Sequence, residues 1–414
     1  MKLASSFLML LASSIKMAST QELQEEGRYL RGRQAPDDST GRILAPPSGE
    51  GTMKNIETLT LSPSSECTTI YNADICQKFV DIRNDLAKGK PFNMNAFKLL
   101  KQQMKDIRKT DPKRKEFKDV VTKVLDRNKN KPGKVGKELA LEVINELQSL
   151  DLKQKLTSDI AYGYSVPDEM ATIDPYAGQD DSPLSLAGYN VTVSEYEEGG
   201  NRRLGVPATS RRWTNGIVKY SVVFETDYSG YWRWVERVLP AMNEIEDLTE
   251  ITFELQTYYW TFDSAPSNGQ VYITAVPNLV CNAHVGAPPS NVKHRVSLGP
   301  TCLRGTILHE LLHVIGMQHQ QNAFYRDKYV TVYYQNIQTA YSSAFDKLPS
   351  THGFEFVYDY GSIMHYGELA FSSNNLKTID CRGYRCGQLD GLSYWDVLEV
   401  YYFNRGYYVF NTQL

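Results

Sequence analysis

Histidine and tryptophan are absent from the first 212 residues of this 414-residue chain, and all seven histidines and five tryptophans lie beyond that point. The first half is rich in lysine and straight-chain helix formers, whereas the second is dense in aromatic and β-branched residues. Because a domain commonly holds about 150 residues, this length favours two folded parts, or one part with extensions. The change in composition places their boundary near residues 200–213.

An excess of positive charge is also lacking, since the formal net charge is -3. The chain therefore has no global attraction to nucleic acid or to an anionic membrane, and we expect no nucleic-acid partner. No segment reaches the roughly 20 apolar residues that a membrane-spanning helix needs, which predicts no stable membrane insertion. With 41% hydrophobic and 22% charged residues, the composition is that of an ordinary globular protein.

The N-terminus has the pattern of a secretory signal. Lys2 supplies a positive charge, residues 3–15 form an apolar stretch softened by serine, and small residues at 18–20 form a candidate cleavage site. We therefore expect residues 1–19 to be a signal peptide and the protein to be secreted and extracellular. A frayed terminus of a cytosolic protein is the alternative.

Cysteine is scarce, and none of the six cysteines stands in a C-x-x-C arrangement. They fall in three sequential pairs, and bonding each to its neighbour needs only short loop closures, although other connectivities are possible. Three disulfides agree with export, whereas free thiols in a reducing cytosol are the alternative. The expected pairs are Cys67-Cys76, Cys281-Cys302 and Cys381-Cys386.

The first half has linkers around a helical region. Residues 20–66 and 165–203 are rich in Gly, Pro, Ser and charge, which is typical of linkers. From about 75–152, apolar residues recur at spacings of three and four, which predicts helices separated at Pro112 and Pro132. The lysines between them are interpreted as the solvated face of a small helical bundle, with polyanion binding as the alternative.

Two dibasic pairs lie at the compositional boundary, at residues 202–203 and 211–212. We expect a trypsin-like or dibasic-specific protease to cut after Arg203 or Arg212 and so activate the protein. Asn190 begins the N-V-T sequence of a possible glycosylation site, a short motif that also arises by chance.

The strongest pattern is HELLHVIGMQH at residues 309–319. On a helix, His309 and His313 stand four residues apart on one face, so both imidazoles can bind one metal ion. Gly316 allows the backbone to end the helix at positive φ, and the turned chain can then present His319 as the third ligand.

The carboxylate of Glu310 is expected beside this ion. Three imidazoles with an open fourth position favour Zn²⁺ as the cofactor, because zinc is a redox-inert Lewis acid that activates water. The alternative is that these histidines are ordinary residues of an amphipathic helix.

A second motif, YGSIMHYG, occupies residues 360–367. The long zinc motif followed by this methionine turn resembles the metzincin metallopeptidases, and S-I-M-H-Y resembles the form found in the astacin family. The resemblance covers about residues 204–402. It implies that Met364 forms an apolar floor under the zinc and that Tyr366 is a switchable fifth ligand that stabilises the oxyanion. Taken singly, both would be interpreted as ordinary core residues.

The resemblance implies an α+β zincin fold, in which a twisted mixed sheet and two long helices lie over an irregular lower subdomain, preceded by a mostly helical propeptide. One helix is expected at about Tyr231 to Asp247, and the other carries the zinc motif. A cleft is expected between the two halves, with substrate extended beside an edge strand at residues 270–275.

The same resemblance sets the domain limits. Residues 20–203 are expected to be the propeptide and residues 204–414 the catalytic domain, with Leu204 as the preferred mature N-terminus and no further module after it. The Cys281-Cys302 pair matches one family disulfide.

The sequence departs from the family pattern at several positions. Gln320 stands where the family has a glutamate that pairs with the mature N-terminus. Glu250 replaces the first cysteine of the second family disulfide, and residues 402–403 lack the other. Asn190 aligns loosely with the propeptide aspartate that blocks the zinc; the other candidates for that role are Asp180 and Asp181.

These features predict a secreted zinc endopeptidase, made as a zymogen, that hydrolyses peptide bonds in protein or peptide substrates with Glu310 as general base. A catalytically inactive zinc-binding or matrix-interaction protein on the same scaffold is the alternative, motivated by Gln320, Asn190 and the long lysine-rich leader. A serralysin-like protease shares the motif, but the paired cysteines and Arg326-Asp327 argue against it.

Overall fold

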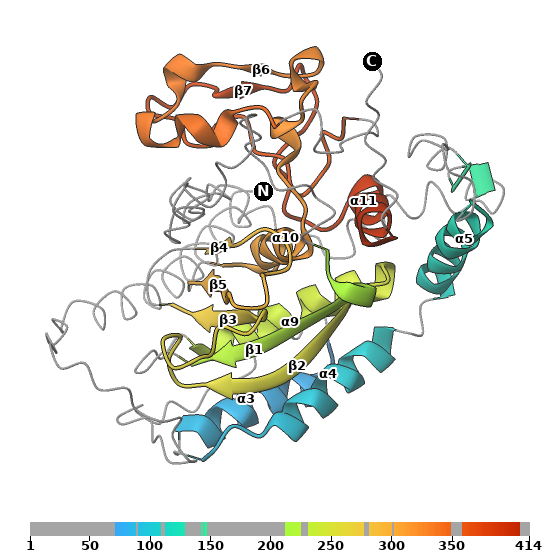
Figure 1. Ribbon diagram of the computed structural model, residues 1–414, viewed down its shortest axis with the longest axis vertical. Coiled ribbons are helices and arrows are strands. Elements are labelled where there is room, and N and C mark those ends of the chain that lie inside the picture. The colour runs from blue at the N-terminus through green and yellow to red at the C-terminus, as the bar shows by residue number, and fades with distance from the viewer. Residues whose placement is uncertain are drawn as a thin grey trace, which may run out of the picture. The chain divides into compact units, whose positions relative to one another are not determined.

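A computed structural model describes residues 71–87, 90–108, 112–128, 142–143, 145–146, 212–224, 231–276, 281–299, 302–348 and 358–405 (Figure 1). The predicted signal peptide and both predicted linkers lie outside these residues. So do Cys67, Asn190 and Arg203. Within the described ranges, no helix is both long and apolar enough to cross a membrane.

A five-stranded mixed sheet is the frame of the second half. Its strand order is β2-β1-β3-β5-β4, with β4 antiparallel to β5 and the other neighbours parallel. All five residues of β3 are buried, as expected for a parallel strand covered on both faces. The strands are β1 (Ile217–Val223), β2 (Thr252–Tyr259), β3 (Val271–Ala275), β4 (Cys281–Ala283) and β5 (His294–Leu298).

Two helices pack with this sheet. The predicted helix near residue 231 is α9 (Tyr231–Leu248), and the zinc motif lies on α10 (Arg304–Ile315). The two helices contact each other, and α10 also contacts β4 and β5. Every residue of α10 is buried, so its ligands are held in a rigid, water-poor setting.

Gly316 ends α10, as the sequence predicts. Its φ is +128°, a conformation that side chains with a Cβ rarely adopt, and its N–H donates to Leu312 O at 3.0 Å. A Cβ at this position would lie 2.5 Å from the ring of Phe403, so a larger residue would both strain the turn and collide with the ring.

The chain beyond Gly316 is irregular. A small sheet of β6 (Thr331–Val332) and β7 (Ile379–Asp380) lies on the other side of α10 from the large sheet (Figure 1), and α11 (Tyr394–Arg405) follows. Short 3-10 helices fill much of the rest: Gln320–Asn322, Arg326–Lys328, Tyr334–Asn336 and Thr339–Phe345. A further 3-10 turn, Thr214–Gly216, precedes β1. The predicted α+β fold is confirmed.

Three helices of the first half are described: α3 (Ala73–Ala87), α4 (Met94–Arg108) and α5 (Pro112–Asn128). Pro112 begins α5, where its missing N–H costs no hydrogen bond. All three helices contact α9, and their apolar residues belong to the same core cluster as those of the sheet. The interpretation of the lysines as a solvated face is wrong for Lys101, because it forms an ion pair with Glu246 of α9 and its side chain is 14% exposed.

The predicted edge strand is also wrong. Residues 271–275 form β3, which lies between β1 and β5 and has hydrogen-bonded neighbours on both sides. The edges of the sheet are β2 and β4. A local pattern of apolar residues does not report how many neighbours a strand acquires, which is why the sequence misplaced the edge.

Cys281 pairs with Cys302, which ties β4 to the segment before α10, and Cys381 pairs with Cys386. Cys76 is disulfide-bonded as well, and its expected partner lies outside the described residues. Glu250, at the position of the missing family cysteine, instead accepts hydrogen bonds from the guanidinium of Arg405 at the end of α11, one of them from Nε at 2.7 Å. An ion pair therefore joins these segments in place of a covalent bond.

Candidate metal centre

Three imidazole nitrogens converge at the end of α10. His309 and His313 occupy successive turns of one face of the helix, and their side chains are 0% and 3% exposed. The Nε2 atoms of both lie 3.1 Å from Nε2 of His319, which the turn after Gly316 brings back toward the helix. The structure therefore brings the three predicted ligands together.

The opposite nitrogens of the helical histidines are fixed by backbone carbonyls. His309 Nδ1 lies 2.8 Å from Ile363 O, and His313 Nδ1 lies 2.8 Å from Met317 O. Because a carbonyl can only accept, each Nδ1 must carry the proton, and in the neutral imidazole each Nε2 then presents a lone pair. This tautomer is the one that a metal ligand needs.

The residues fit a zinc ion. Two nitrogens at about 2.0 to 2.1 Å from one zinc, in tetrahedral geometry, are about 3.3 to 3.4 Å apart, close to the separations found here. Lone pairs that face one another at this distance repel unless a metal ion or a proton lies between them. His309, His313 and His319 also form a group whose ligand atoms lie within 4.8 Å of one another.

Glu310 follows His309 on α10, and its side chain is fully buried. Bulk water therefore has little access to its carboxylate. A buried base beside a metal site is the arrangement that water activation requires.

The methionine turn is hydrogen-bonded to both ends of the zinc motif. Ile363 supplies the carbonyl that orients His309, and Met364 O accepts the N–H of Gln320, the residue after His319, at 2.9 Å. Met364 itself is 2% exposed and belongs to the large core cluster. The turn thus fixes the histidines relative to one another, besides supplying apolar contact.

Tyr366 is buried and lies against the third histidine. Its ring centroid is 4.6 Å from that of His319, and its N–H donates to Gln321 Oε1 at 3.1 Å. The rings of Phe345 and Phe371 enclose it at centroid distances of 5.5 and 5.4 Å. The predicted tyrosine is therefore beside the metal centre and is positioned by aromatic contacts.

Asp396 of α11 is a residue that the sequence analysis missed. Its carboxylate accepts hydrogen bonds from Ser362 Oγ at 2.5 Å and Ile363 N at 3.0 Å, and Ser362 Oγ in turn accepts the N–H of Met364 at 3.0 Å. Asp396 therefore fixes the methionine turn through hydrogen bonds to its first two residues after Gly361. The helix α11 that carries it is buried almost all round, so no amphipathic period marked it in the sequence.

A second carboxyl group, Asp359, lies beside Asp396. Both accept hydrogen bonds from Ser393, from its Oγ at 2.5 Å and from its N–H at 2.8 Å respectively. Burial, with the neighbouring Asp396 charge, raises the pKa of Asp359 to about 7. The folded protein thus retains a proton that the unfolded chain releases near its ordinary pKa of about 4.

This raised pKa predicts how stability changes with pH. A carboxyl group with a raised pKa in the folded state contributes stability at low pH, and that contribution is lost as the pH rises from about 4 to about 7. We expect the melting temperature of Asp359→Asn, relative to wild type, to increase between pH 4.5 and pH 7.5. Thermal unfolding of both chelator-treated proteins measures this; a constant difference across that range would contradict it.

His365 follows the methionine but is not part of the centre. Its Nδ1 lies 2.7 Å from Tyr366 O and its Nε2 lies 2.7 Å from the hydroxyl of Tyr358, and burial lowers its pKa to about 4. It also lies near Cys381 and Cys386, but those sulfurs are bonded to each other.

Of the predicted processing residues, Arg212 is described and is partly buried just before Trp213, whose indole N–H donates to Val314 O of α10 at 2.8 Å.

Comparison with known proteins agrees with this site. The family model "Astacin (Peptidase family M12A)" matches residues 205–404. Zinc metalloproteinase nas-4 from Caenorhabditis elegans is 33% identical over 206 residues, which is 45% of this chain and 61% of that protein. High choriolytic enzyme 1 from Oryzias latipes is 30% identical over 194 residues, which is 46% of this chain and 67% of that protein.

The solved structure of that hatching enzyme, a zinc-protease, aligns with 28% identity and a TM-score of 0.40, over 50% of this chain and 98% of its own. Several curated relatives are much longer than the region they share with this chain, which covers 36%, 61%, 42% and 45% of four of them. The residues that the family model matches include the three histidines and the methionine turn.

Proposed function

The chain belongs to the astacin family, and from this premise we propose that it is a secreted zinc endopeptidase, made as a zymogen, that hydrolyses peptide bonds in proteins. The observation that carries the proposal is the convergence of three Nε2 atoms next to a buried glutamate, with the Nδ1 atoms of His309 and His313 held by carbonyls. His309, His313 and His319 would hold the zinc, which when bound supplies a Lewis acid that polarises a carbonyl and lowers the pKa of water.

Glu310 takes the proton of the attacking water and then passes it to the departing amine. One carboxylate can perform both transfers because it is a base before the attack and an acid after it. Its burial and its place on the rigid helix α10 hold it in one orientation for both steps.

Tyr366 donates a hydrogen bond from its hydroxyl to the oxyanion that develops as the carbonyl is attacked. Contact with the His319 ring supports this role, because it places the phenol next to the metal centre. The enclosing rings of Phe345 and Phe371 restrict the directions in which the phenol can move.

Substrate is proposed to lie extended along β4. This strand is an edge of the sheet, it contacts α10, and Cys281-Cys302 fixes its start. Backbone pairing with an edge strand recognises any extended peptide, which suits an endopeptidase with protein substrates.

Cleavage by a trypsin-like or dibasic-specific protease would activate the zymogen. A cut after Arg203 would begin the catalytic chain at Leu204, the preferred start, whereas a cut after Arg212 would begin it at Trp213. Residues 1–19 as signal peptide, residues 20–203 as propeptide and Asn190 as a glycosylation site belong to the same proposal. The sequence pattern at each position supports it.

An experiment on the whole chain tests the proposal. Zinc content and hydrolysis of a quenched peptide are measured before and after cleavage of the linker, with and without a chelator. Stoichiometric zinc with chelator-sensitive hydrolysis that appears on cleavage is the expected result. Zinc without hydrolysis in either form would favour the inactive zinc-binding scaffold.

Substitution of Tyr366 by phenylalanine tests its role separately. We expect kcat to fall about 10²- to 10³-fold with zinc content and KM little changed, because the ring keeps its contacts while the oxyanion loses one donor. Steady-state kinetics on a peptide substrate measure this, with Tyr384→Phe as the matched control, since Tyr384 is 61% exposed. An unchanged kcat in Tyr366→Phe would show that the hydroxyl takes no part.

A further inference from the structure

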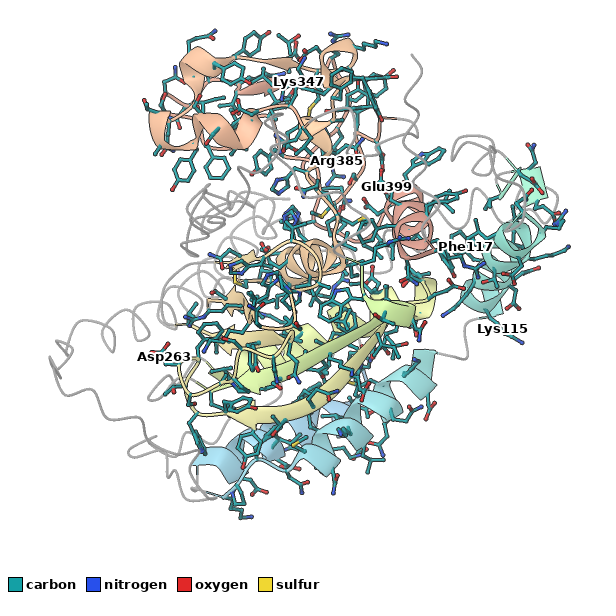
Figure 2. All side chains as sticks on the ribbon, viewed as in Figure 1. Lys115, Phe117, Asp263, Lys347, Arg385 and Glu399 are labelled. Atoms are coloured by element: carbon teal, nitrogen blue, oxygen red, sulfur yellow. A yellow bond between two sulfur atoms is a disulfide. The ribbon has the colours of Figure 1, made fainter. Side chains whose placement is uncertain are left out.

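The apolar faces of α4 and α5 are part of the core of the second half. Phe97, Leu100 and Met104 of α4 are at most 2% exposed, and they belong to the same cluster as the buried residues of α9 and the sheet. Figure 2 shows Phe117 on the side of α5 that faces the rest of the structure and Lys115 pointing away from it. These side chains would be exposed to water if the helices left.

Phe92, just before α4, extends this core through aromatic contacts. Its ring lies 5.1 Å from that of Phe224, directly after β1, and 5.5 Å from that of Tyr258 on β2, both in edge-on geometry. Phe224 also contacts Trp260 at 5.6 Å, so Phe92 completes a cluster whose other members lie on β2 or directly after β1 and β2.

A buried acid on α9 depends on lysines of α4. Glu246 is 4% exposed, and its carboxylate accepts hydrogen bonds from Lys101 Nζ at 2.7 Å, from Lys105 Nζ at 3.2 Å and from Phe253 N at 2.7 Å. Lys101 also donates to Phe253 O at 2.8 Å, so it caps a backbone group of the edge strand β2. Without α4, the carboxylate would lose both ammonium partners.

A separate contact joins α5 to α11. Arg405 donates from one terminal nitrogen to Asp126 Oδ1 at 2.6 Å while its other nitrogens bind Glu250. The described disulfides Cys281-Cys302 and Cys381-Cys386 both close within the second half, so neither links it to these helices.

The contact of α4 with β2 lies at the opposite edge of the sheet from the metal centre. Lys101 binds β2, whereas α10 contacts β4 and β5, and three strands separate β2 from β4 in the strand order. In Figure 1, α3 and α4 run along the β2 side. Helices bound there can remain in place without covering the histidines.

We propose that residues 71–128 stay bound to the second half, through α9 and the β2 edge, after the chain is cut at residue 203, so that the processed enzyme consists of two non-covalently joined chains. This inference rests on the proposed function, in which cleavage at residue 203 activates the zymogen. Activation then needs cleavage but not dissociation of these helices.

A specific protease site inserted between Arg203 and Leu204 tests the proposal in the full chain, with an affinity tag at the C-terminus. After cleavage the protein is diluted, incubated and passed through gel filtration, and the fractions are run on denaturing non-reducing gels. The expected result is one species that contains both fragments in equal amounts. Elution of the N-terminal fragment away from the tagged chain would overturn the proposal.

The contact with Glu246 is tested by Lys101→Met, which keeps the length of the side chain and removes its charge. We expect the N-terminal fragment to dissociate at least about tenfold faster, because the buried carboxylate loses its principal partner. Lys90→Met is the matched control, since Lys90 pairs only with exposed Asp85 of the same fragment in the described structure. Before cleavage, both variants should show the same thermal unfolding transition as the wild-type chain. Equal dissociation rates for two such variants would overturn the assigned contact.

Peptidase activity in the same fractions separates this inference from the proposed function. A retained fragment with no chelator-sensitive hydrolysis would contradict the proposed function and support the inference. Active enzyme from which the fragment has dissociated would support the function and overturn the inference.

Discussion

Glu310→Gln is expected to lower kcat/KM by at least about 10³-fold while zinc content stays stoichiometric. The amide has nearly the same shape as the carboxylate, so the fully buried position tolerates it, but an amide cannot take a proton from water or deliver one to the leaving amine. Loss of a general base alone costs about 10² to 10⁴ in rate, and here one group is assigned both transfers.

Hydrolysis of a quenched peptide by the cleaved protein, together with metal analysis of the same sample, measures this effect. Glu254→Gln is the control, because this substitution makes the same chemical change at an exposed position on β2. Activity in Glu310→Gln above a tenth of wild type would show that another group accepts the proton. Loss of zinc with loss of activity would assign Glu310 a role in metal binding instead.

His319→Ala is expected to remove both zinc and activity while leaving α10 folded. Structural zinc binds with about 10 to 16 kcal/mol over four ligands, or roughly 3 kcal/mol for each, so the loss of one imidazole weakens affinity at least about 100-fold. His319 is the informative choice because it lies beyond the helix and is partly exposed, whereas His309 and His313 are buried within α10.

A chelator and re-addition experiment measures this effect. Wild-type protein should lose hydrolysis on chelation and regain it when zinc is restored, whereas His319→Ala should remain inactive at the same zinc concentration. Circular dichroism of the variant checks that the fold is retained. Full activity of His319→Ala at micromolar zinc would mean that two imidazoles suffice and that His319 is not a ligand.

The zinc motif could be recognised in the sequence because its geometry is local. Two histidines four residues apart share a helix face by helical periodicity alone, and Gly316 marks the turn that returns the third. The methionine turn was identified by its resemblance to a family, since nothing in S-I-M-H-Y itself indicates contact with residues 309–319. The structure supplies that contact through Ile363 O and Met364 O.

Other features could not be inferred from local pattern. Asp396 acts on Ser362 and Ile363 from 34 and 33 residues away, and an aspartate in an aromatic-rich segment carries no mark of that role. Residues 271–275 have the buried character of a strand but not the edge position assigned to them, because strand order depends on crossover connections.

The sequence by itself predicted the ligand set and the base from residue types at fixed short spacing, and it predicted the family and the α+β class from the resemblance that its two motifs carry. Only the tertiary structure decided which strand is the edge beside α10, that Arg405 takes the place of a disulfide at Glu250, and that Lys101 of the first half binds Glu246 of the second. These depend on contacts between residues as many as 155 positions apart, such as Arg405 and Glu250. Burial of apolar surface brings such residues together, because it does not depend on how far apart they are in the sequence.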